Sequence, residues 1–319
     1  MTARVGLVLG GGGVAATAWH AGVLTALHEM CGWDARAADL IVGTSGGAVT
    51  AASLRAGLPP ADLADSALGR PLSAAAATLL APLWASWAQP AAPAPHPARS
   101  FRRGAALAAL ARRPWRARTG LVTATLAPAG RLPLDEIIRL GDLLLPAGFP
   151  SAPLWLPAVR VADLSRVTFG RSGAPATTPG RALAASCAVP GLFTPVQIAG
   201  EAYVDGGAFS PTNLDLVADA ALGLTVVSAP MSVSKPADDL KSWPPNAATR
   251  YLQHEVRRVR AAGSRVSVFA PTVRERLVLG QPASATYLRD IATMAYAAAQ
   301  RRLASPQVCE GLALIRPAG

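Results

Sequence analysis

The sequence contains little cysteine and little histidine, and the few copies lie far apart. Its 319 residues include three cysteines, which are too few and too scattered for a disulfide framework or a zinc site. The four histidines share no metal-ligand spacing either. We therefore expect no metal and no cofactor. The residues concerned are Cys31, Cys187, Cys309, His20, His28, His96 and His254.

Apolar runs long enough to span a membrane are also missing, since a spanning helix needs about 18 or more such residues. The longest weakly charged run, residues 71–98, is interrupted repeatedly by proline. The first residues pass from a short apolar run directly into glycines and lack the features of a signal peptide. We expect a cytoplasmic protein that can also lie peripherally on a membrane.

Lysine is nearly absent. Only Lys235 and Lys241 occur among 30 basic residues, so arginine carries nearly all of the positive charge, and with 19 acidic residues the formal net charge is +11. This charge suits an anionic surface such as phospholipid head groups, although a compositional bias toward arginine explains it equally well. Because no zinc finger and no aromatic-and-basic RNA-binding signature is present, we expect no nucleic-acid partner.

The residues that are present favour a folded α/β protein. Hydrophobic residues make up 51% of the chain and charged residues 15%, which argues against global disorder. Apolar runs at 4–9 and 38–43 predict buried strands, and each is followed by a segment with helical spacing, 16–30 and 47–57. This alternation predicts a mostly parallel sheet flanked by helices.

The rest of the chain continues this pattern after an interruption at 71–118. We assign 4–220 to a catalytic domain, 71–118 to a Pro/Ala/Trp-rich helical cap inserted into it, and 221–319 to an α/β continuation packed on the same domain. Further strands are expected near 158–164, 166–170, 201–205, 224–230 and 265–271, and helices near 134–144, 180–189, 246–262 and 284–303.

The cap has a composition that suits contact with lipid. Trp84 and Trp87 lie close to several leucines, and 101–118 adds arginines beside apolar residues. Tryptophan favours the membrane interface, and arginine is attracted to anionic lipid. Two interpretations remain open, a membrane-binding patch and a small core internal to the cap.

Ser45 lies in "IVGTSGGAVTA" (41–51), where it follows a predicted strand and precedes a predicted helix. Gly43 and Gly47 complete a G-x-S-x-G pattern, and in this context a sharp turn exposes the serine oxygen while the glycines leave room for strand and helix to meet. The following helix directs free N–H groups, beginning at Gly46, toward the serine. A plain glycine turn is the alternative.

Two other motifs carry candidate chemistry. Gly11, Gly12 and Gly13 follow the first strand, where their N–H groups can cradle an oxyanion. The glycine run also fits a dinucleotide fingerprint, but the acidic residue which that fingerprint requires at the end of the second strand is missing. Far downstream, Asp205 ends a predicted strand before Gly206 and Gly207. It is either part of a turn or a carboxylate base for the serine.

Together, "LVLGGGG", "GTSGG" and "DGG" resemble the patatin-like phospholipases, and "ASCAVPGLFTPV" resembles the segment before the aspartate in that family. The resemblance covers about residues 4–220. It implies a three-layer α/β fold and a serine-dependent lipid acyl hydrolase, with Ser45 as nucleophile, Asp205 as base and the glycine run as oxyanion loop. The chain departs from the family where Ala15 and Ala16 replace the usual Arg or Lys and Gly.

Two alternatives stand beside this interpretation. Ser45, Asp205 and His254 have the chain order of an α/β-hydrolase triad. However, Ser45 comes early for that fold, and His254 lies within a predicted helix among arginines. The second alternative is a catalytically weak protein that binds lipid surfaces.

Overall fold

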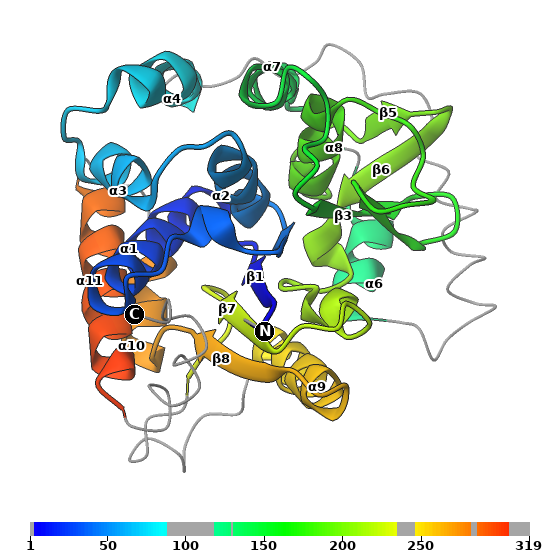
Figure 1. The fold of residues 1–319 in the computed structure, drawn as a ribbon. Helices are drawn as coiled ribbons and strands as arrows, with labels where there is room; N and C mark the ends of the chain where they lie inside the picture. The colour runs from blue at the N-terminus through cyan, green and yellow to red at the C-terminus, as the bar shows by residue number, and fades with distance from the viewer. Residues whose placement is uncertain (1–2, 88–117, 129, 235–245, 282–285, 306–319) are drawn as a thin grey trace.

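The computed structural model describes residues 3–87, 118–128, 130–234, 246–281 and 286–305, and it contains an eight-stranded mixed sheet (Figure 1). The strands run in the order β5-β6-β3-β2-β1-β7-β8, and β4 pairs with β3 outside this path. The pairs among β3, β2, β1, β7 and β8 are parallel, and those of β3 with β4 and β6, and of β5 with β6, are antiparallel. The bounds are β1 Val5–Leu9, β2 Leu40–Gly43, β3 Leu154–Arg160, β4 Arg166–Phe169, β5 Val196–Ile198, β6 Glu201–Asp205, β7 Leu224–Ser228 and β8 Arg265–Phe269.

The central strands are buried on both faces, which explains their continuous apolar runs. Leu7, Leu9 and Ile41 face a core shared with the helices that precede and follow the second strand, whereas Val8 and Val42 face a second core on the other side. The sheet is therefore the middle layer of three, and the α/β fold class predicted from the sequence is confirmed. This confirmation does not extend to the predicted cap at 71–118.

Helices α1 (Gly13–Cys31), α2 (Gly46–Arg55), α8 (Pro179–Cys187) and α11 (Tyr287–Leu303) cover the first face, and α9 (Ala247–Ala261) covers the second with the short helix η4 (Leu214–Val217). Helix α1 packs along α11, as Figure 1 shows. The remaining helices are α3 Pro60–Leu68, α4 Ala74–Trp87, α6 Thr119–Leu126, α7 Asp135–Leu144 and α10 Val273–Leu279, with short η1 Ala35–Ala37 and η3 Gly206–Ala208.

Local sequence signals set several helix ends. Gly32 terminates α1 with a left-handed backbone (φ 66°), a conformation that glycine adopts without steric penalty. Pro60 occupies the first turn of α3, where its missing N–H leaves no hydrogen bond unmade. The proline pair at 59–60 therefore lies at the start of α3, after α2 has already ended at Arg55.

The third strand lies closer to the N-terminus than predicted, at 154–160 instead of 158–164. Asp163 accepts hydrogen bonds from Arg160 and from the N–H of Ser165, and Leu164 adopts φ 58°, so these residues form a tight turn into β4. Pro157 lies within the true strand and weakens its signal.

The predicted cap at 71–118 falls largely outside the described residues. Helix α4 lies within it, but the side chains of Trp84 and Trp87 are outside the described set, so their contact with lipid stays a prediction. In the part of the chain predicted as a C-terminal continuation, β7 pairs directly with β1 and β8 pairs with β7.

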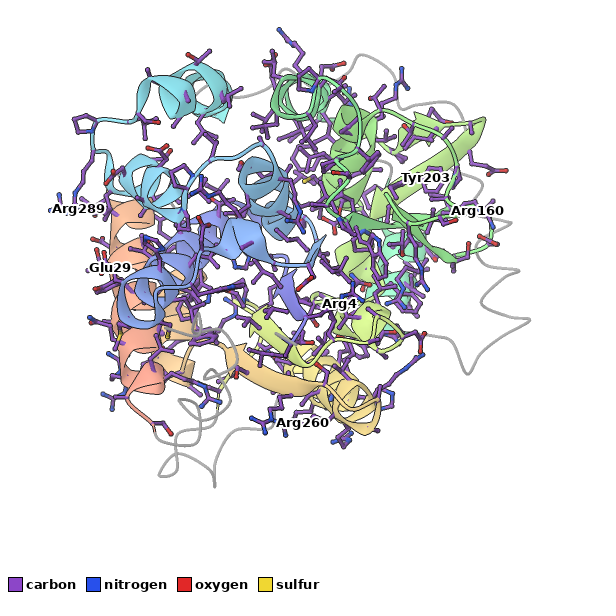
Figure 2. The ribbon with its side chains drawn as sticks, viewed as in Figure 1. Arg4, Glu29, Arg160, Tyr203, Arg260 and Arg289 are labelled. Atoms are coloured by element: carbon purple, nitrogen blue, oxygen red, sulfur yellow. The ribbon has the colours of Figure 1, made fainter. Side chains whose placement is uncertain are left out.

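The arginines are spread widely over the molecule. Arg160, Arg260 and Arg289 lie at the periphery on different sides in Figure 2, far from one another. Within the described ranges, the structure contains no helix that combines the length and the apolar character needed to cross a bilayer.

Candidate active site

Ser45 occupies a strained turn between β2 and α2. Its backbone angles are φ 54° and ψ −124°, a conformation that side-chain-bearing residues rarely adopt and that marks functional turns. Gly43 and Gly47 make this turn possible. A Cβ on Gly43 would lie 2.6 Å from the Cβ of Ala51, and one on Gly47 would collide with the carbonyl of Leu9. The turn has the geometry of a nucleophile elbow.

Asp205 ends β6 and is buried, with 4% of its surface exposed. Its carboxylate accepts the N–H of Gly207 at 2.6 Å, and the hydroxyl of Ser45 lies near enough to stabilise its charged form by hydrogen bonding. Burial raises the pKa of Asp205 from 3.8 to about 6, although these two hydrogen bonds oppose the rise. The result is a carboxylate that is far more basic than an exposed one, in contact with a serine hydroxyl.

Residues at the C-terminal end of α8 contact both the Ser45 turn and Asp205. The N–H of Ser45 donates to the hydroxyl of Ser186 at 3.2 Å, and the N–H of Asp205 donates to the carbonyl of Ala188 at 2.9 Å. One segment, 186–188, therefore contacts both candidate residues. In the sequence, this segment stands out only through its resemblance to a family motif.

The glycine run supplies a different set of N–H groups from the one predicted. The N–H of Gly11 donates to the carbonyl of Pro211 at 2.8 Å, so it is not free to bind an oxyanion. The N–H groups of Gly12, Gly13 and Gly46 have no hydrogen-bond acceptor among the described residues. Gly12 and Gly13 have φ 146° and 63°, which favour glycine. The candidate hydrogen-bond donors to an oxyanion are therefore the N–H groups of Gly12, Gly13 and Gly46.

The departure at Ala15 and Ala16 is accommodated within the packing. Both residues are buried in the first turn of α1. The Cβ of Ala16 lies 3.2 Å from where a Cβ on Gly12 would lie and 3.3 Å from the same point on Gly46. The methyl group thus packs beside both glycine turns.

His20 is a buried neutral histidine that anchors the glycine run. Its Nε2 lies 2.8 Å from the carbonyl of Gly10, which can only accept, so Nε2 carries the proton. Its Nδ1 then accepts from the hydroxyl of Ser228 at 2.7 Å. Burial lowers the pKa of His20 to about 4. The sequence did not predict these contacts, because they depend on how α1 packs against the end of β1 and on Ser228, which is remote in the chain.

A cavity of about 340 Å³ opens beside Ser45, Gly13 and Gly46. A volume of this size is typical of small-molecule pockets. The wall is almost entirely apolar, with Glu136 as its single charged group. The remaining lining residues are Val14, Val49, Leu132, Pro133, Leu134, Ile137, Cys187, Val189 and Phe193. Of the two stretches that form most of this wall, 187–193 lies within the segment that resembles the family motif, whereas 132–137 matched no motif in the sequence.

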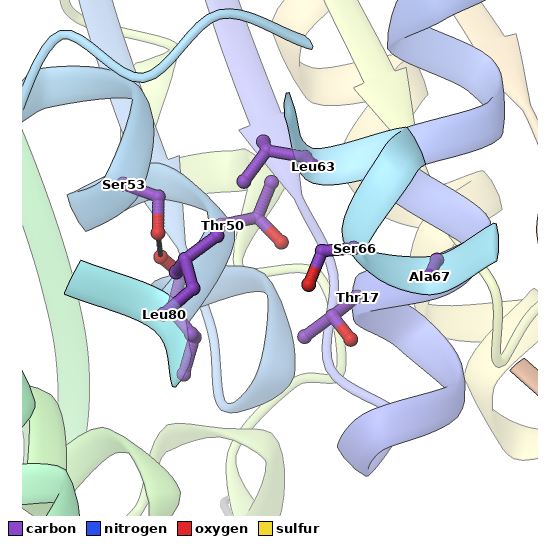
Figure 3. A pocket seen from close by; sticks show the side chains of 8 residues that line it. Thr17, Thr50, Ser53, Leu63, Ser66, Ala67 and Leu80 are labelled. Carbon is purple, nitrogen blue, oxygen red and sulfur yellow. Dashed lines mark hydrogen bonds between the residues drawn. The ribbon is translucent and has the colours of Figure 1, made fainter. Parts of the chain in front are cut away.

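A second cavity lies on the other side of α2, between α1, α3 and α4 (Figure 3). Its volume is about 30 Å³, and Thr17, Thr50, Ser53 and Ser66 contribute hydroxyl groups to its wall. It is far too small for an acyl chain. The larger cavity is therefore the candidate substrate site.

Other candidates lie apart from this site. His254 is exposed on α9, so its position does not favour a serine–aspartate–histidine triad. Across the described ranges, no three His, Cys, Asp or Glu side chains gather in a way that could hold a metal ion.

The family of the chain follows from its similarity to known proteins. A search of curated proteins finds no match. Among solved structures, VipD from Legionella pneumophila is similar, with a TM-score of 0.40 and 14% identity over 95% of this chain and 67% of the VipD chain. A family model for the patatin-like phospholipases matches residues 7–218, a range that contains Ser45, Asp205 and the glycine run. The chain therefore belongs to the patatin-like phospholipase family of carboxylic ester hydrolases.

Proposed function

We propose that the chain hydrolyses lipid acyl esters through a Ser45–Asp205 dyad and a covalent acyl-enzyme. The observation that carries this proposal is the contact between a serine hydroxyl in a strained elbow and a buried, basic carboxylate. A serine hydroxyl is a weak nucleophile and needs a base in hydrogen-bond contact. Asp205 meets that requirement, and the exposed position of His254 leaves the dyad as the better supported mechanism.

In the first half-reaction, the Oγ of Ser45 attacks the ester carbonyl carbon as its proton passes to Asp205. The carbonyl oxygen becomes an oxyanion, and we assign its stabilisation to the N–H groups of Gly12, Gly13 and Gly46, for which the described residues provide no other partner. When the C–O bond to the alcohol breaks, protonated Asp205 donates its proton to the leaving oxygen. The acyl group is then bound to Ser45 as an ester.

In the second half-reaction, water attacks the acyl-enzyme while Asp205 accepts a proton from it. A second oxyanion forms in the same place and collapses as the bond to Ser45 breaks. Asp205 returns the proton to the Oγ of Ser45, which releases a carboxylic acid and restores the enzyme. A base with a pKa of about 6 suits both directions of transfer, because it ionises just below neutral pH and still binds a proton readily.

The apolar cavity supports an acyl chain as the part of the substrate held during the reaction. It begins at Ser45 and is walled by aliphatic and aromatic side chains, so the hydrocarbon would be removed from water while its ester lies at the nucleophile. Phospholipids, lysophospholipids and glycerides all present such a chain. A panel of these lipids is therefore the appropriate substrate test.

A fluorophosphonate probe tests the nucleophile, and the lipid panel tests the reaction. We expect the wild-type protein to be labelled and to release fatty acid from at least one lipid class. Ser45→Ala should lose both properties, Asp205→Asn should lose turnover, and His254→Ala should retain both. Equal labelling of the Ser45→Ala variant, or loss of activity in His254→Ala as complete as in Ser45→Ala, would refute the dyad.

A further inference from the structure

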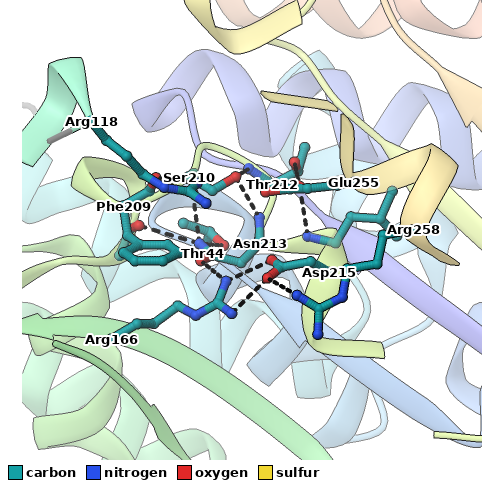
Figure 4. Close-up of polar contacts among 12 residues, drawn as sticks. Thr44, Arg118, Arg166, Phe209, Ser210, Thr212, Asn213, Asp215, Glu255 and Arg258 are labelled. Carbon is teal, nitrogen blue, oxygen red and sulfur yellow. Dashed lines mark hydrogen bonds and ion pairs between the residues drawn. The ribbon is translucent and has the colours of Figure 1, made fainter. Parts of the chain in front are cut away.

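One buried segment, Ser210–Leu214, contacts all three motifs of the candidate site. Figure 4 shows Asn213 of this segment beside Thr44. The carbonyl of Pro211 accepts the N–H of Gly11. The side-chain Nδ2 of Asn213 lies 3.2 Å from the hydroxyl of Thr44, 3.2 Å from the carbonyl of Gly206 and 2.6 Å from the carbonyl of Ser210, so its two N–H groups are shared among three acceptors. Thr44 precedes the candidate nucleophile and Gly206 follows the candidate base. Asn213 therefore connects the turn of Ser45 to the turn of Asp205.

The sheet itself does not make this connection. In the strand order, β3 lies between β2, which leads to Ser45, and β6, which ends at Asp205. Adjacent strands lie about 4.8 Å apart, so β2 and β6 are about 10 Å apart and share no backbone hydrogen bond. A hydrogen bond between Ser45 and Asp205 requires the two turns to converge beyond the strand ends. Asn213 lies between these turns and bonds to both.

The orientation of the Asn213 amide is fixed by its partners. The carbonyls of Gly206 and Ser210 can only accept, and Nδ2 donates to them at 3.2 and 2.6 Å. The guanidinium of Arg166 can only donate, and it reaches Oδ1 at 3.0 Å. Asn213 is fully buried and has φ 51°, a left-handed conformation that asparagine tolerates better than most residues.

The segment around Asn213 is itself held on both sides. Arg166 forms a bidentate pair with Asp215 at 2.6 and 2.8 Å. The Oε2 of the buried Glu255 accepts the hydroxyl of Thr212 at 2.7 Å and the N–H of Leu214 at 3.0 Å. The bonds from Arg166 and to Glu255 hold the residues next to Asn213, and this limits how far the Asn213 amide can move.

We propose that Asn213 is a positioning residue, which holds the Ser45 turn and the Asp205 turn at their working separation through the Thr44 hydroxyl and the Gly206 carbonyl. The proposal rests on the proposed function, because it assigns a role in the same dyad. A misplacement of about 1 Å can lower turnover about 100-fold. Asn213 touches neither the cavity wall nor the reacting atoms, so its loss should act on the chemical step and leave the binding of substrate nearly unchanged.

The most selective test removes only the Thr44 hydroxyl. Thr44→Val preserves the shape of the side chain, and Asn213 keeps Gly206 and Ser210 as acceptors, so the fold should persist. We expect kcat to fall at least about 10-fold with KM nearly unchanged, and Thr44→Ser to restore kcat because it restores the hydroxyl. The matched control is Thr225→Val, which removes another buried threonine hydroxyl, in β7, and should leave kcat unchanged.

Asn213→Asp is the second variant. Aspartate has the same shape and retains an acceptor for Arg166, but it cannot donate to Thr44 or Gly206. We expect a loss of about 100-fold in kcat. Wild-type kcat in a folded Thr44→Val protein, or equal losses in Thr44→Val and Thr44→Ser, would overturn the proposal.

A readout that is independent of turnover separates this inference from the proposed function. If the wild-type protein neither hydrolyses lipid nor reacts with the probe, the proposed function fails, but the carboxyl carbon of Asp205 can still be titrated by NMR. Because the hydrogen bond from Ser45 lowers the pKa of Asp205, loosening it in Thr44→Val should move the titration midpoint upward, and Thr44→Ser should restore it. An unchanged midpoint in Thr44→Val would overturn the positioning role.

Discussion

The hydroxyl of Ser45 lies near enough to the carboxylate of Asp205 to stabilise its charged form by hydrogen bonding, although the strands that carry these residues are not neighbours in the sheet. This proximity joins a turn with a positive φ of 54° to one of the most deeply buried carboxylates of the described residues. Burial makes the carboxylate a stronger base, and the hydrogen bond directs that basicity to one hydroxyl. The predictions below follow from this pair and from the groups around it.

The first prediction concerns the dependence of activity on pH. Asp205 must be ionised to accept the proton of Ser45, and its pKa is about 6. We therefore expect kcat/KM to rise with pH through about 6 and to level off above it, because kcat/KM reports ionisations of the free enzyme. A short-chain p-nitrophenyl ester, assayed from acid to weakly alkaline pH, measures this profile. A midpoint near the ordinary value of 3.8 would contradict the assignment.

The second prediction concerns the effect of the same carboxylate on stability. Folding raises the pKa of Asp205 from 3.8 to about 6, so the folded state favours the neutral form. The stabilisation that this preference gives is full below pH about 4 and is lost as the pH rises through about 6. At pH about 8, ionised Asp205 then lowers the free energy of unfolding by up to about 3 kcal/mol.

Asp205→Asn is neutral at every pH and retains the shape of the side chain. We expect it to be more stable than the wild type at pH about 8, by up to about 3 kcal/mol, and to match it below pH about 4. Urea unfolding at both pH values measures the difference. Asp219→Asn, an exposed change of the same kind, is the control and should show no such pH-dependent gain. A variant that is less stable than wild type at both pH values would contradict the prediction.

The third prediction concerns the oxyanion donors. A methyl group on Gly46 would collide with the carbonyl of Gly13, so Gly46→Ala should push the nucleophile turn away from the glycine run. Loss of one such donor typically lowers turnover about 100- to 1000-fold, and we expect a decrease of that size. Gly32→Ala is the control: it lies in open space at φ 66°, so it should lower stability by about 1 kcal/mol and leave turnover unchanged. Wild-type turnover in folded Gly46→Ala would remove Gly46 from the site.

The fourth prediction concerns the acyl cavity. Val189 lines its wall and is partly exposed, so Val189→Trp should narrow the cavity with little effect on folding. We expect kcat/KM to fall for long-chain p-nitrophenyl esters and to be retained for short-chain ones. Leu192→Trp introduces the same side chain at an exposed residue outside the cavity wall and should change neither value of kcat/KM. Parallel losses for both chain lengths in Val189→Trp would contradict an acyl-binding role.

Local sequence was enough to predict most of the strands, the main helices and the three motifs, whereas the three-residue strand β5 was not predicted. The elbow at Ser45 was predictable because strand, glycines and helix follow one another within a few residues. The third strand was misplaced because Pro157 weakens its pattern, and the turn after it depends on the side chain of Asp163. Sequence patterns predict a strand or turn reliably only where residues close together in the chain determine its structure.

Contacts between distant segments account for what could not be predicted. The N–H of Gly11 is occupied by the carbonyl of Pro211, which no local pattern discloses, and so the predicted oxyanion loop was one residue too long. The cavity wall combines apolar residues from 132–137 with others from 187–193, and apolar residues are equally expected in any core. Asn213 and His20 gain their roles only through the fold.

The pairing of β1 with β7 has a consequence for the order of events during synthesis. A ribosome makes the glycine run and Ser45 early, but Ser228, whose carbonyl binds the N–H of Gly10 and whose hydroxyl binds His20, emerges much later. Until then β1 lacks one of its two neighbours, and such long-range pairings form slowly. The nascent chain therefore contains the candidate nucleophile before the contacts that order the glycine run can form. We expect a chain that ends before Ser228 to be inactive toward lipid, because its sheet cannot close.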